Sequence, residues 1–522
     1  MNDNAVRLRD NKIVRLIPVI LLIGVSLFLH LYKISDIPRG IYIDEIAMAY
    51  DSWSLGHFGV ERHLSSWPLY LNNCGGGQSV LYCYLDMPLL MLMGITPLAI
   101  RLPSIIFSMI ACVCGWRVVA RNHGYRAGIL YLAIFTLVPY FTMAGRMGLD
   151  CNQMLGLCVL MIDLIDMAIH KNRKGLFVAA GIVGGITFYS YALSYLILPL
   201  FVVLLAVYLL WVRKITIGDI LRLCIPMVIL GAPLLVVQII NLCDLPELKI
   251  GAITFTKQID YRANEVGFGH IGENIRGLYR CIFKTDISQF SNFENYSNLY
   301  PISLPIVIGG AVLSMITLVK NVMKREYSLA SVVLLFTGCV AAVALLLDGI
   351  LTYRINPIFF GLAYMIVLVL ETIVNYKDKW CKCAVILVMV TYVLYFAAFA
   401  QYYFCVYPDD IYPQRLFGDD PTAAIEYVRS QDAEIADKPI AICDMNEAYL
   451  HYLAGGEISP YDYDLAKYGN IGTPELMFYE PDEYNTAKNY ILYVPSDEEI
   501  ADLESKGFTL TQMGSFVIAI AY

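Results

Sequence analysis

Two adjacent carboxylates, Asp44 and Glu45, follow the first long apolar stretch of the chain. The loop that contains them is rich in Trp, Tyr, Gly and His, whereas the rest of the chain is dominated by apolar residues. A carboxylate in such a loop can act as a general base and take a proton from an incoming hydroxyl or amine. Acidic residues are also favoured at a helix N-terminus by its dipole, and the isolated pair fits that structural role better.

The residues that follow Asp44 indicate the element that would hold it. Residues 44–51 have helical spacing, and small and apolar residues offer one side of the helix to an apolar environment. These are Ala47, Met48, Ala49 and Leu55. We therefore predict an amphipathic helix that lies in the membrane interface and holds the Asp44 carboxylate at headgroup depth.

A second acid, Asp150, follows Arg146 at a spacing of four, so the two side chains share a helix face. One interpretation is a local ion pair at the end of a membrane span. The other is that Asp150 faces Asp44 across a cavity while Arg146 binds a phosphate. Charges at a membrane edge are unfavourable enough to indicate a functional role by default.

A third candidate position is Arg354, which stands at the start of an otherwise apolar stretch. The planar guanidinium group is suited to bidentate recognition of phosphate. The alternative is an arginine that only extends to the interface to keep its charge solvated. The long loop 241–301 adds basic residues among aromatic ones, and we expect it to form a lid over an anionic lipid headgroup.

The composition predicts that membrane-spanning helices position these residues. Of the 522 residues, 58% are hydrophobic and only 16% are charged, and the mean hydropathy is +0.60. Spans of roughly 20 apolar residues account for such a composition, whereas a soluble domain does not need it. The apolar runs are continuous rather than alternating, which indicates helices and argues against an outer-membrane barrel. The 14 cysteines show no disulfide framework and no zinc-site spacing.

The distribution of Lys and Arg predicts the topology of a multi-pass plasma-membrane protein. Basic residues cluster in alternate connections, which places residues 1–12 in the cytoplasm and loops 34–97 and 241–301 outside it. The apolar run 87–94 is predicted to be a helix that lies on the membrane surface. Eleven spans are predicted, near residues 13–33, 98–120, 126–144, 150–169, 175–193, 195–212, 220–240, 302–320, 328–348, 355–375 and 383–404.

The C-terminal residues 404–522 form a different compositional unit. They contain 6 Lys and Arg against 22 Asp and Glu, a net charge of −16, which leaves +8 for residues 1–403. Alternating helices and strands predict a small extracytoplasmic α/β domain. It shows no glycine-rich phosphate loop and no triad, which favours a substrate-gripping or scaffolding role. The predicted elements are a helix at 421–430, strands at 439–443, 489–494 and 515–521, and a helix at 497–506.

The motifs of the membrane region resemble those of a known family. The Asp-Glu pair, the stretch YLDMPLLMLMG, the sequence AIRLPS and the sequence GRMGLD occur in this order within residues 34–152. This pattern resembles the GT-C glycosyltransferases, in particular bacterial relatives of protein O-mannosyltransferases and lipid A aminoarabinose transferases. The resemblance extends over the predicted catalytic membrane domain, residues 13–403.

The resemblance implies transfer of a sugar from a polyprenyl-phosphate donor outside the cytoplasm, with inversion at the anomeric carbon. It assigns the general base to Asp44, with Glu45 beside it, and acceptor positioning or metal binding to Asp150. Two carboxylates would suit Mg²⁺ or Mn²⁺, while no cofactor is required. The implied donor-phosphate contacts are Arg354, Arg146, Arg101 and Gln78. The candidate substrate contacts are Tyr50, His63, Trp67, Tyr82 and Tyr353.

The expected acceptor is a lipid, a cell-wall glycan or a protein, and no nucleic-acid partner is expected. One alternative is a transporter or flippase of lipid-linked sugars, and another is a non-catalytic polysaccharide-handling scaffold. Transporters place polar residues near the middle of the bilayer in broken helices. In this chain the candidate residues gather at one predicted membrane face, which favours the enzyme.

Overall fold

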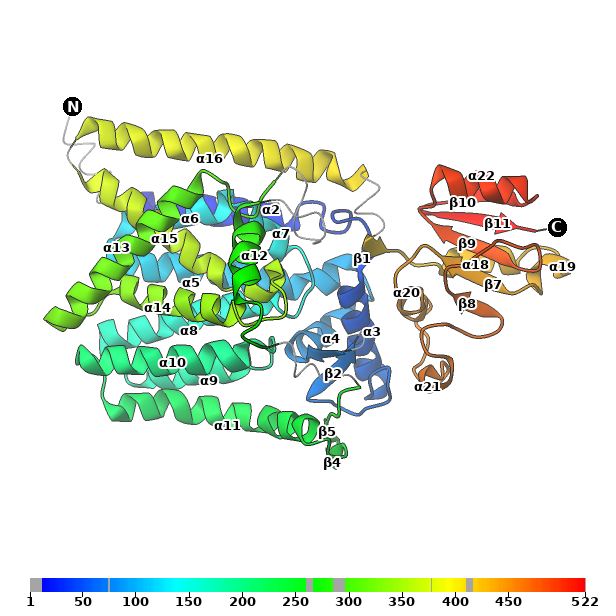
Figure 1. The fold of residues 1–522 in the computed structure, drawn as a ribbon, viewed down its shortest axis with the longest axis horizontal. Helices are drawn as coiled ribbons and strands as arrows, with labels where there is room; N and C mark the ends of the chain where they lie inside the picture. The colour runs from blue at the N-terminus through cyan, green and yellow to red at the C-terminus, as the bar shows by residue number, and fades with distance from the viewer. Residues whose placement is uncertain are drawn as a thin grey trace.

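The computed structural model describes residues 12–73, 76–259, 266–284, 296–376, 378–409 and 416–521. Most of the predicted cytoplasmic N-terminus, residues 1–11, lies outside the described residues. Within the described part, long apolar helices form a bundle, and a small domain with a β-sheet is attached to one end of it (Figure 1).

Each of the eleven predicted spans coincides with a helix of the bundle. Among the described residues, eight helices are long and apolar enough to cross a membrane, and the polytopic helical architecture is confirmed. They are α2 (Lys12–Leu31), α5 (Pro97–His123), α8 (Asn152–Lys171), α10 (Ser194–Trp211), α11 (Ile217–Leu242), α13 (Ser303–Lys324), α15 (Ile358–Asn375) and α16 (Lys379–Cys405). Two further predicted spans are the shorter apolar helices α9 (Gly175–Thr187) and α14 (Leu329–Ala344).

The remaining predicted span is broken into two helices. α6 (Tyr125–Leu137) and α7 (Pro139–Gly145) meet at an angle of 64° and together pass the length and hydropathy requirements of a span. Pro139 has no backbone N–H and restricts the preceding residue to extended conformations. Val138 accordingly has φ −89° and ψ 123°, so the break follows from the proline.

The helix that carries Asp44 is α3 (Ile43–Phe58), and it packs against α4 (Leu81–Met93) and α20 (Ala448–Gly455). The predicted helix is present, but the predicted amphipathic character is wrong, because every residue from 45 to 55 is buried. Several of its polar side chains are hydrogen-bonded within the protein. The hydroxyl of Ser52, for example, donates to the carbonyl of Met48 at 2.6 Å.

Two β-hairpins from the predicted external loops meet beside α3. In loop 34–97, β2 (Tyr70–Asn73) pairs with β3 (Gly76–Ser79), and in loop 241–301, β4 (Leu248–Ile250) pairs with β5 (Ile253–Phe255). The backbone N–H of Leu69 donates to the carbonyl of Thr254 at 2.9 Å, which joins the two hairpins. The second loop also contains α12 (Ile271–Phe283). These elements lie at the end of the bundle that faces the small domain (Figure 1).

The predicted C-terminal α/β domain is confirmed. Its five-stranded sheet has the order β10-β11-β9-β7-β8, in which β7 runs parallel to β8 and β9 while the other pairs are antiparallel. The strands are β7 (Ile440–Cys443), β8 (Leu476–Phe478), β9 (Asn489–Tyr493), β10 (Thr509–Met513) and β11 (Phe516–Ile520). The helices besides α20 are α18 (Thr422–Arg429), α19 (Ala433–Ala436), α21 (Leu465–Tyr468) and α22 (Asp497–Ser505).

The C-terminal domain is joined to the Asp44 region by backbone pairing and by a common core. Strand β1 (Ile41–Tyr42), directly before α3, pairs antiparallel with β6 (Phe417–Gly418). The hydroxyl of Tyr50 on α3 donates to the carbonyl of Ile458 at 2.6 Å. Apolar residues of α3 and of α20 belong to one continuous buried cluster. The composition of the chain changes near residue 404, but residues before and after this position share one buried core.

Candidate active site

Asp44 and Asp150 lie close together at the end of the bundle. Asp44, in the first turn of α3, is partly exposed, and its Oδ1 accepts a hydrogen bond from Nδ2 of Asn73 at 3.2 Å. Asp150 directly precedes α8, is 8% exposed, and accepts the backbone N–H groups of Ser79 at 3.1 Å and Cys151 at 2.7 Å. Burial raises the pKa of Asp150 to about 7, those N–H groups oppose the rise, and the negative charge of Asp44 adds to it.

Asp150 and Arg354 line the same cavity, which has a volume of about 360 Å³. Arg354 belongs to the short 3₁₀ helix η2 (Thr352–Ile355), which precedes α15. Leu193 and Leu196 at the start of α10 and Leu242 at the end of α11 contribute apolar walls. The cavity therefore combines a guanidinium group and a carboxyl group with an apolar surface from membrane-spanning helices. We call it the donor cavity.

The β2–β3 hairpin shapes one wall of the donor cavity through a glycine. Tyr70 and Gly77 line the cavity, together with Gln258 from the second external loop. A Cβ atom on Gly77 would overlap the Tyr70 ring and would lie 3.0 Å from Cδ of Gln258. Only glycine allows these two side chains to approach the hairpin as closely as they do. The contribution of Gln258 and Val266 shows that loop 241–301 borders the cavity, as expected for a lid.

The predicted residues Gln78 and Tyr353 are also placed beside the acids. Oε1 of Gln78 accepts a hydrogen bond from Nδ2 of Asn73 at 3.0 Å, so Gln78 helps to orient the amide that contacts Asp44. Tyr353 lies in η2 next to Arg354. Burial raises the pKa of its phenol, the charge of Arg354 lowers it, and the charge of Asp44 raises it.

Glu45 and Arg101 form a buried ion pair rather than part of the substrate surface. Both side chains are fully buried, and Nε of Arg101 lies 3.1 Å from Oε1 of Glu45. The other donors of Arg101 are directed to the carbonyls of Ile34, Pro38 and Gly40 at 2.7–3.1 Å. Because the guanidinium group is fully engaged within the protein, the predicted phosphate contact by Arg101 is wrong.

Glu45 has a bridging role in this ion pair. Its Oε1 also accepts the backbone N–H of Gly148 at 2.6 Å, and its Oε2 accepts the backbone N–H of Tyr42 at 3.0 Å. The side chain thus connects the start of α3 with the turn that leads to Asp150. A catalytic contact by Glu45 is not compatible with this burial, and we correct its role to positioning.

Arg146 is also a structural residue. It is fully buried, and its two terminal nitrogens donate to the carbonyls of Leu29, His30, Lys33 and Ile37 at 2.7–3.2 Å. Its guanidinium group lies 5.6 Å from the ring centroid of Tyr403 and 5.2 Å from that of Phe404. The sequence indicated a cation beside Asp150, but the side chain is directed to the C-terminal end of α2. The predicted phosphate contact by Arg146 is therefore wrong.

The predicted aromatic contacts divide into two groups. Tyr50 and Tyr82 are fully buried, and the hydroxyl of Tyr82 donates to the carbonyl of Ile100 at 2.6 Å, so neither can contact a substrate. The indole of Trp67 stacks on Tyr84 with a centroid separation of 6.0 Å. Trp67 lines neither the donor cavity nor the second cavity, which is described in the next paragraph. His63 lines a second cavity, and Tyr353 remains beside Arg354 and Asp44.

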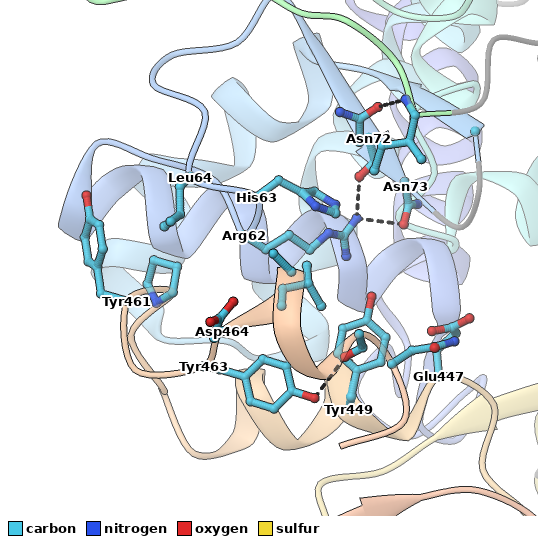
Figure 2. Close-up of a pocket in the computed structure, with 17 residues that line it drawn as sticks. Arg62, His63, Leu64, Asn72, Asn73, Glu447, Tyr449, Tyr461, Tyr463 and Asp464 are labelled. Atoms are coloured by element: carbon cyan, nitrogen blue, oxygen red, sulfur yellow. Dashed lines mark hydrogen bonds between the residues drawn. The ribbon is translucent and has the colours of Figure 1, made fainter. Parts of the chain in front are cut away.

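The second cavity lies between the first external loop and the C-terminal domain and has a volume of about 730 Å³. Figure 2 shows that Arg62 and the Asn72–Asn73 pair form one side, while Tyr449 and Tyr463 of the C-terminal domain form the other. We call it the interdomain cavity. Asn73 belongs to its lining and also donates to Asp44, so a single residue connects the interdomain cavity with this carboxylate.

Two residues that position Asp44 were not found from the sequence. Nη2 of Arg62 donates to Oδ1 of Asn73 at 2.8 Å and to the carbonyl of Asn72 at 3.0 Å, and the same nitrogen lies 3.4 Å from Oδ2 of Asp51. Arg62 thus fixes the amide that contacts Asp44. No spacing pattern indicates Arg62 and Asn73, because the fold of the external loop, rather than one helix, brings them to Asp44.

A divalent cation could be held by the two acids together with a substrate. Within the described ranges, no group of three or more His, Cys, Asp and Glu side chains is close enough to form a protein-only metal site. Mg²⁺ is commonly bound by one or two carboxylates plus substrate phosphate oxygens. The β2–β3 hairpin contacts both carboxylates, since the Asn73 amide donates to Asp44 and the backbone N–H of Ser79 donates to Asp150. The pair fits that kind of site.

Comparison with known proteins supports the resemblance found in the sequence. A family model described as dolichyl-phosphate-mannose-protein mannosyltransferase matches residues 79–238. This segment contains Arg101, Arg146 and Asp150, whereas Asp44 and Arg354 lie outside it. A search of curated proteins finds no match to the chain.

Solved structures show the same fold over the whole chain. The chain is similar to ArnT from Cupriavidus metallidurans in the apo state, with a TM-score of 0.55 and 11% sequence identity. It is also similar to the same protein bound to undecaprenyl phosphate, with a TM-score of 0.51 and 12% identity. Each alignment covers 97% of this chain and 98% of ArnT. The predicted GT-C fold is thereby confirmed.

Proposed function

We propose that this GT-C-fold chain is an inverting glycosyltransferase that moves a sugar from a polyprenyl-phosphate donor to an acceptor at the extracytoplasmic face of the membrane. The observation that carries the proposal is the donor cavity, in which Asp150 and Arg354 meet apolar walls from α10 and α11 beside Asp44. The family match over residues 79–238 and the ArnT-like fold support this class of reaction. The basic residues of the alternate loops support the extracytoplasmic location.

The donor cavity fits the two parts of a lipid-linked sugar phosphate. Leu193, Leu196 and Leu242 offer an apolar surface at the ends of α10 and α11, where a polyprenyl chain can enter from the bilayer. The Arg354 guanidinium group provides charge-assisted donors for the phosphate. ArnT, which has this fold, has been determined in complex with undecaprenyl phosphate. We place the phosphate of the donor beside Arg354, and Tyr353 as its neighbour.

The chemistry requires one base and one stabilised leaving group. As the acceptor hydroxyl or amine attacks the anomeric carbon, the bond between that carbon and the phosphate oxygen breaks and a new glycosidic bond forms. The acceptor proton passes to the Asp44 carboxylate, and the polyprenyl phosphate leaves as an anion next to Arg354. A single displacement inverts the anomeric configuration. Asn73, held by Arg62 and Gln78, keeps the Asp44 carboxylate oriented.

We propose that Asp44 and Asp150 hold Mg²⁺ or Mn²⁺ when such an ion is present. Bound there, the ion would supply positive charge to the donor phosphate. No other cofactor is needed for the transfer. A lipid, a glycan or a protein remains a candidate acceptor on the evidence of the donor cavity alone.

The proposal is tested with Asp44→Asn in protein reconstituted in nanodiscs. The assay supplies polyprenyl-phosphate mannose and glucose donors with membrane extract as the source of acceptor, and measures the released polyprenyl phosphate. We expect Asp44→Asn to lower turnover by about 10²–10⁴-fold, because general-base catalysis contributes about that much. Asp437→Asn, an exposed aspartate of the C-terminal domain, is the matched control and should keep full activity.

Two outcomes would contradict the proposal. Full turnover by Asp44→Asn would exclude Asp44 as the base. A wild-type protein that binds the donor and translocates it without releasing sugar would instead be a transporter or flippase. Binding of undecaprenyl phosphate, measured by native mass spectrometry, should remain intact in Asp44→Asn and weaken in Arg354→Ala.

A further inference from the structure

The interdomain cavity combines polar groups of different kinds with aromatic rings. The external loop contributes Arg62, His63 and Asn72, and the C-terminal domain contributes carboxylates and phenols. The latter include Glu447, Tyr449, Tyr461, Tyr463 and Asp464. The volume of about 730 Å³ is within the range of about 300–1,000 Å³ that is usual for small-molecule sites. Such a lining differs from the donor cavity, whose walls are largely aliphatic and aromatic.

The polar side of the interdomain cavity is fixed before any ligand enters. Nη2 of Arg62 is held by the carbonyl of Asn72, by Oδ1 of Asn73 and by the nearby Asp51 carboxylate. Arg62 is only 3% exposed, so its position is determined by these contacts rather than by solvent. Pre-organised polar groups of this kind reduce the entropy lost on binding.

His63 adds a neutral imidazole to the same side. Burial and the positive charge of Arg62, in that order, lower the pKa of His63 to about 4, while a hydrogen bond to the backbone of Asn72 opposes this change. The imidazole is therefore uncharged at neutral pH, and one of its nitrogens is engaged with Asn72. The other nitrogen can accept a hydrogen bond from a sugar hydroxyl.

The aromatic side is formed by tyrosines of the C-terminal domain. Tyr449 and Tyr463 are nearly parallel, with ring centroids 6.5 Å apart and an interplanar angle of 20°. The hydroxyl of Tyr463 donates to the carbonyl of Gly469 at 2.9 Å, which holds its ring in place. Tyr461 lies at the rim, is 61% exposed and makes an edge contact with Phe58. Aromatic faces pack against apolar ring surfaces, while phenol groups offer hydrogen bonds.

The interdomain cavity is connected with the proposed base through Asn73. That residue lines the cavity and donates to Oδ1 of Asp44 at 3.2 Å. A ligand in the interdomain cavity is thus separated from the Asp44 carboxylate by the Asn73 side chain. This places an acceptor in the cavity next to the proposed base.

We propose that the interdomain cavity binds a saccharide, so that the acceptor of the transferred sugar is a glycan. This inference rests on the proposed function and specifies its acceptor. The aromatic rings contact the C–H faces of sugar rings, while His63, Asp464 and the phenol groups bind the hydroxyl groups, and Arg62 and the asparagine amides hold this side of the cavity in place. A hydroxyl of the bound glycan gives its proton to Asp44 and forms the new bond to the anomeric carbon. The bond from that carbon to the donor phosphate breaks.

The test measures saccharide binding without turnover, using full-length protein in nanodiscs. Saturation-transfer difference NMR is recorded with maltotriose, mannotriose and tri-N-acetylchitotriose, and with a Ser/Thr-rich hexapeptide. We expect at least one trisaccharide to bind. Tyr461→Ala should weaken its affinity by about fivefold, since an aromatic contact contributes about 0.5–1.5 kcal/mol. Tyr461→Phe keeps the ring and should bind like the wild type.

Tyr376→Ala is the matched control, because Tyr376 is 65% exposed and lies far along the chain at the end of α15. Absence of binding by every trisaccharide, or unchanged affinity in Tyr461→Ala, would overturn the inference. Binding of the hexapeptide alone, sensitive to Tyr461→Ala, would overturn it in favour of a protein acceptor.

Undecaprenyl phosphate binding, measured on the same samples, separates this inference from the proposed function. If the lipid binds wild type and not Arg354→Ala while no saccharide binds, only the glycan acceptor is rejected. If the lipid does not bind wild type, the donor cavity and the proposed function are rejected as well.

Discussion

At the scale of single residues, the chemistry depends on how Asp44 is held. Its carboxylate accepts a hydrogen bond from Asn73, and Asn73 is in turn fixed by Arg62 and Gln78. Asn73 is therefore a positioning residue, and its replacement should lower the rate of transfer.

Asn73→Asp is expected to move the acidic limb of the pH–rate profile to higher pH. The new carboxylate lies next to Asp44, and a like charge disfavours the charged form and raises the pKa of the base. The profile of kcat/KM reports the base of the free enzyme. Asn73→Ala should lower the rate with a smaller shift, since it adds no charge. An unshifted profile in Asn73→Asp would contradict the contact between these two side chains.

At the scale of elements, the Glu45–Arg101 ion pair joins three segments that lie far apart in the sequence. Glu45 begins α3, Arg101 lies in the first turns of α5, and Gly148 precedes Asp150. A Cβ atom on Gly148 would lie 2.7 Å from the carbonyl oxygen of Ile100, so the approach requires glycine. The sequences around the Asp-Glu pair, RLPS and GRMGLD are thus parts of one packing arrangement. This arrangement sets the separation of Asp44 and Asp150.

Arg101→Ala is expected to destabilise the protein by about 3–5 kcal/mol, because it leaves the buried Glu45 carboxylate without its cation. The double variant Glu45→Gln with Arg101→Met removes both charges and keeps an oxygen for the Gly148 N–H. It should unfold at a higher temperature than Arg101→Ala. Thermal unfolding in detergent, followed by intrinsic fluorescence, measures both. Wild-type stability of Arg101→Ala, combined with loss of donor binding, would restore Arg101 to the phosphate site.

The first external loop contains a second buried charge group, with a consequence for pH. Burial raises the pKa of both Asp51 and Glu61; Arg62 opposes the rise at each, and the charge of Asp51 adds to it at Glu61. The native state therefore keeps these protons to higher pH than the unfolded chain does. The resulting stability is complete below the ordinary carboxyl pKa and is lost as the pH rises through the raised values.

We expect the unfolding temperature to fall between about pH 5 and about pH 8, and Glu61→Gln to flatten this dependence. The same substitution at the exposed Glu504 of α22 is the control and should leave the slope unchanged. A wild-type unfolding temperature that rises over this interval would contradict the raised pKa values.

The sequence predicted the helices and strands better than it predicted the burial and the partners of their side chains. Long apolar runs identified the helices of the bundle, because a bilayer imposes both length and hydropathy on its spans. The burial of α3 on every side was not predictable, since its cover comes from α20, about four hundred residues later. Asp150 and Arg354, which line the donor cavity, were candidates because a charge at a membrane edge is conspicuous. The same rule misplaced Arg146, and the resemblance misplaced Arg101. Both arginines donate to backbone carbonyls, which no residue pattern reveals.

At the scale of the whole molecule, the C-terminal domain is an integral part of the fold. β6 pairs with β1, two residues before Asp44, and Phe417 packs on Tyr42 with a centroid separation of 5.8 Å. Ile46, Tyr50 and Trp53 of α3 share a buried cluster with the domain. The interdomain cavity exists only because of this docking (Figure 2).

Gly40→Ala is expected to lower stability and sugar transfer by disturbing the β1–β6 pairing. Gly40 has φ +77°, and a Cβ atom there would lie 2.5 Å from the carbonyl oxygen of Gly418. Gly94 is the control, because it has a similar φ of +71° while nothing lies within 4 Å of its Cβ position. Thermal unfolding and donor turnover should therefore be affected more in Gly40→Ala than in Gly94→Ala. Equal effects would mean that only backbone strain matters.

The two buried arginines also determine the order in which the chain can be assembled. Together they bind seven carbonyls between Leu29 and Gly40, at and beyond the end of the first span. During synthesis these acceptors emerge first, and at about 5–20 residues per second Arg146 follows roughly 5–20 s later. The segment that follows the first span therefore acquires its native hydrogen bonds only after α5 and α7 have been synthesised.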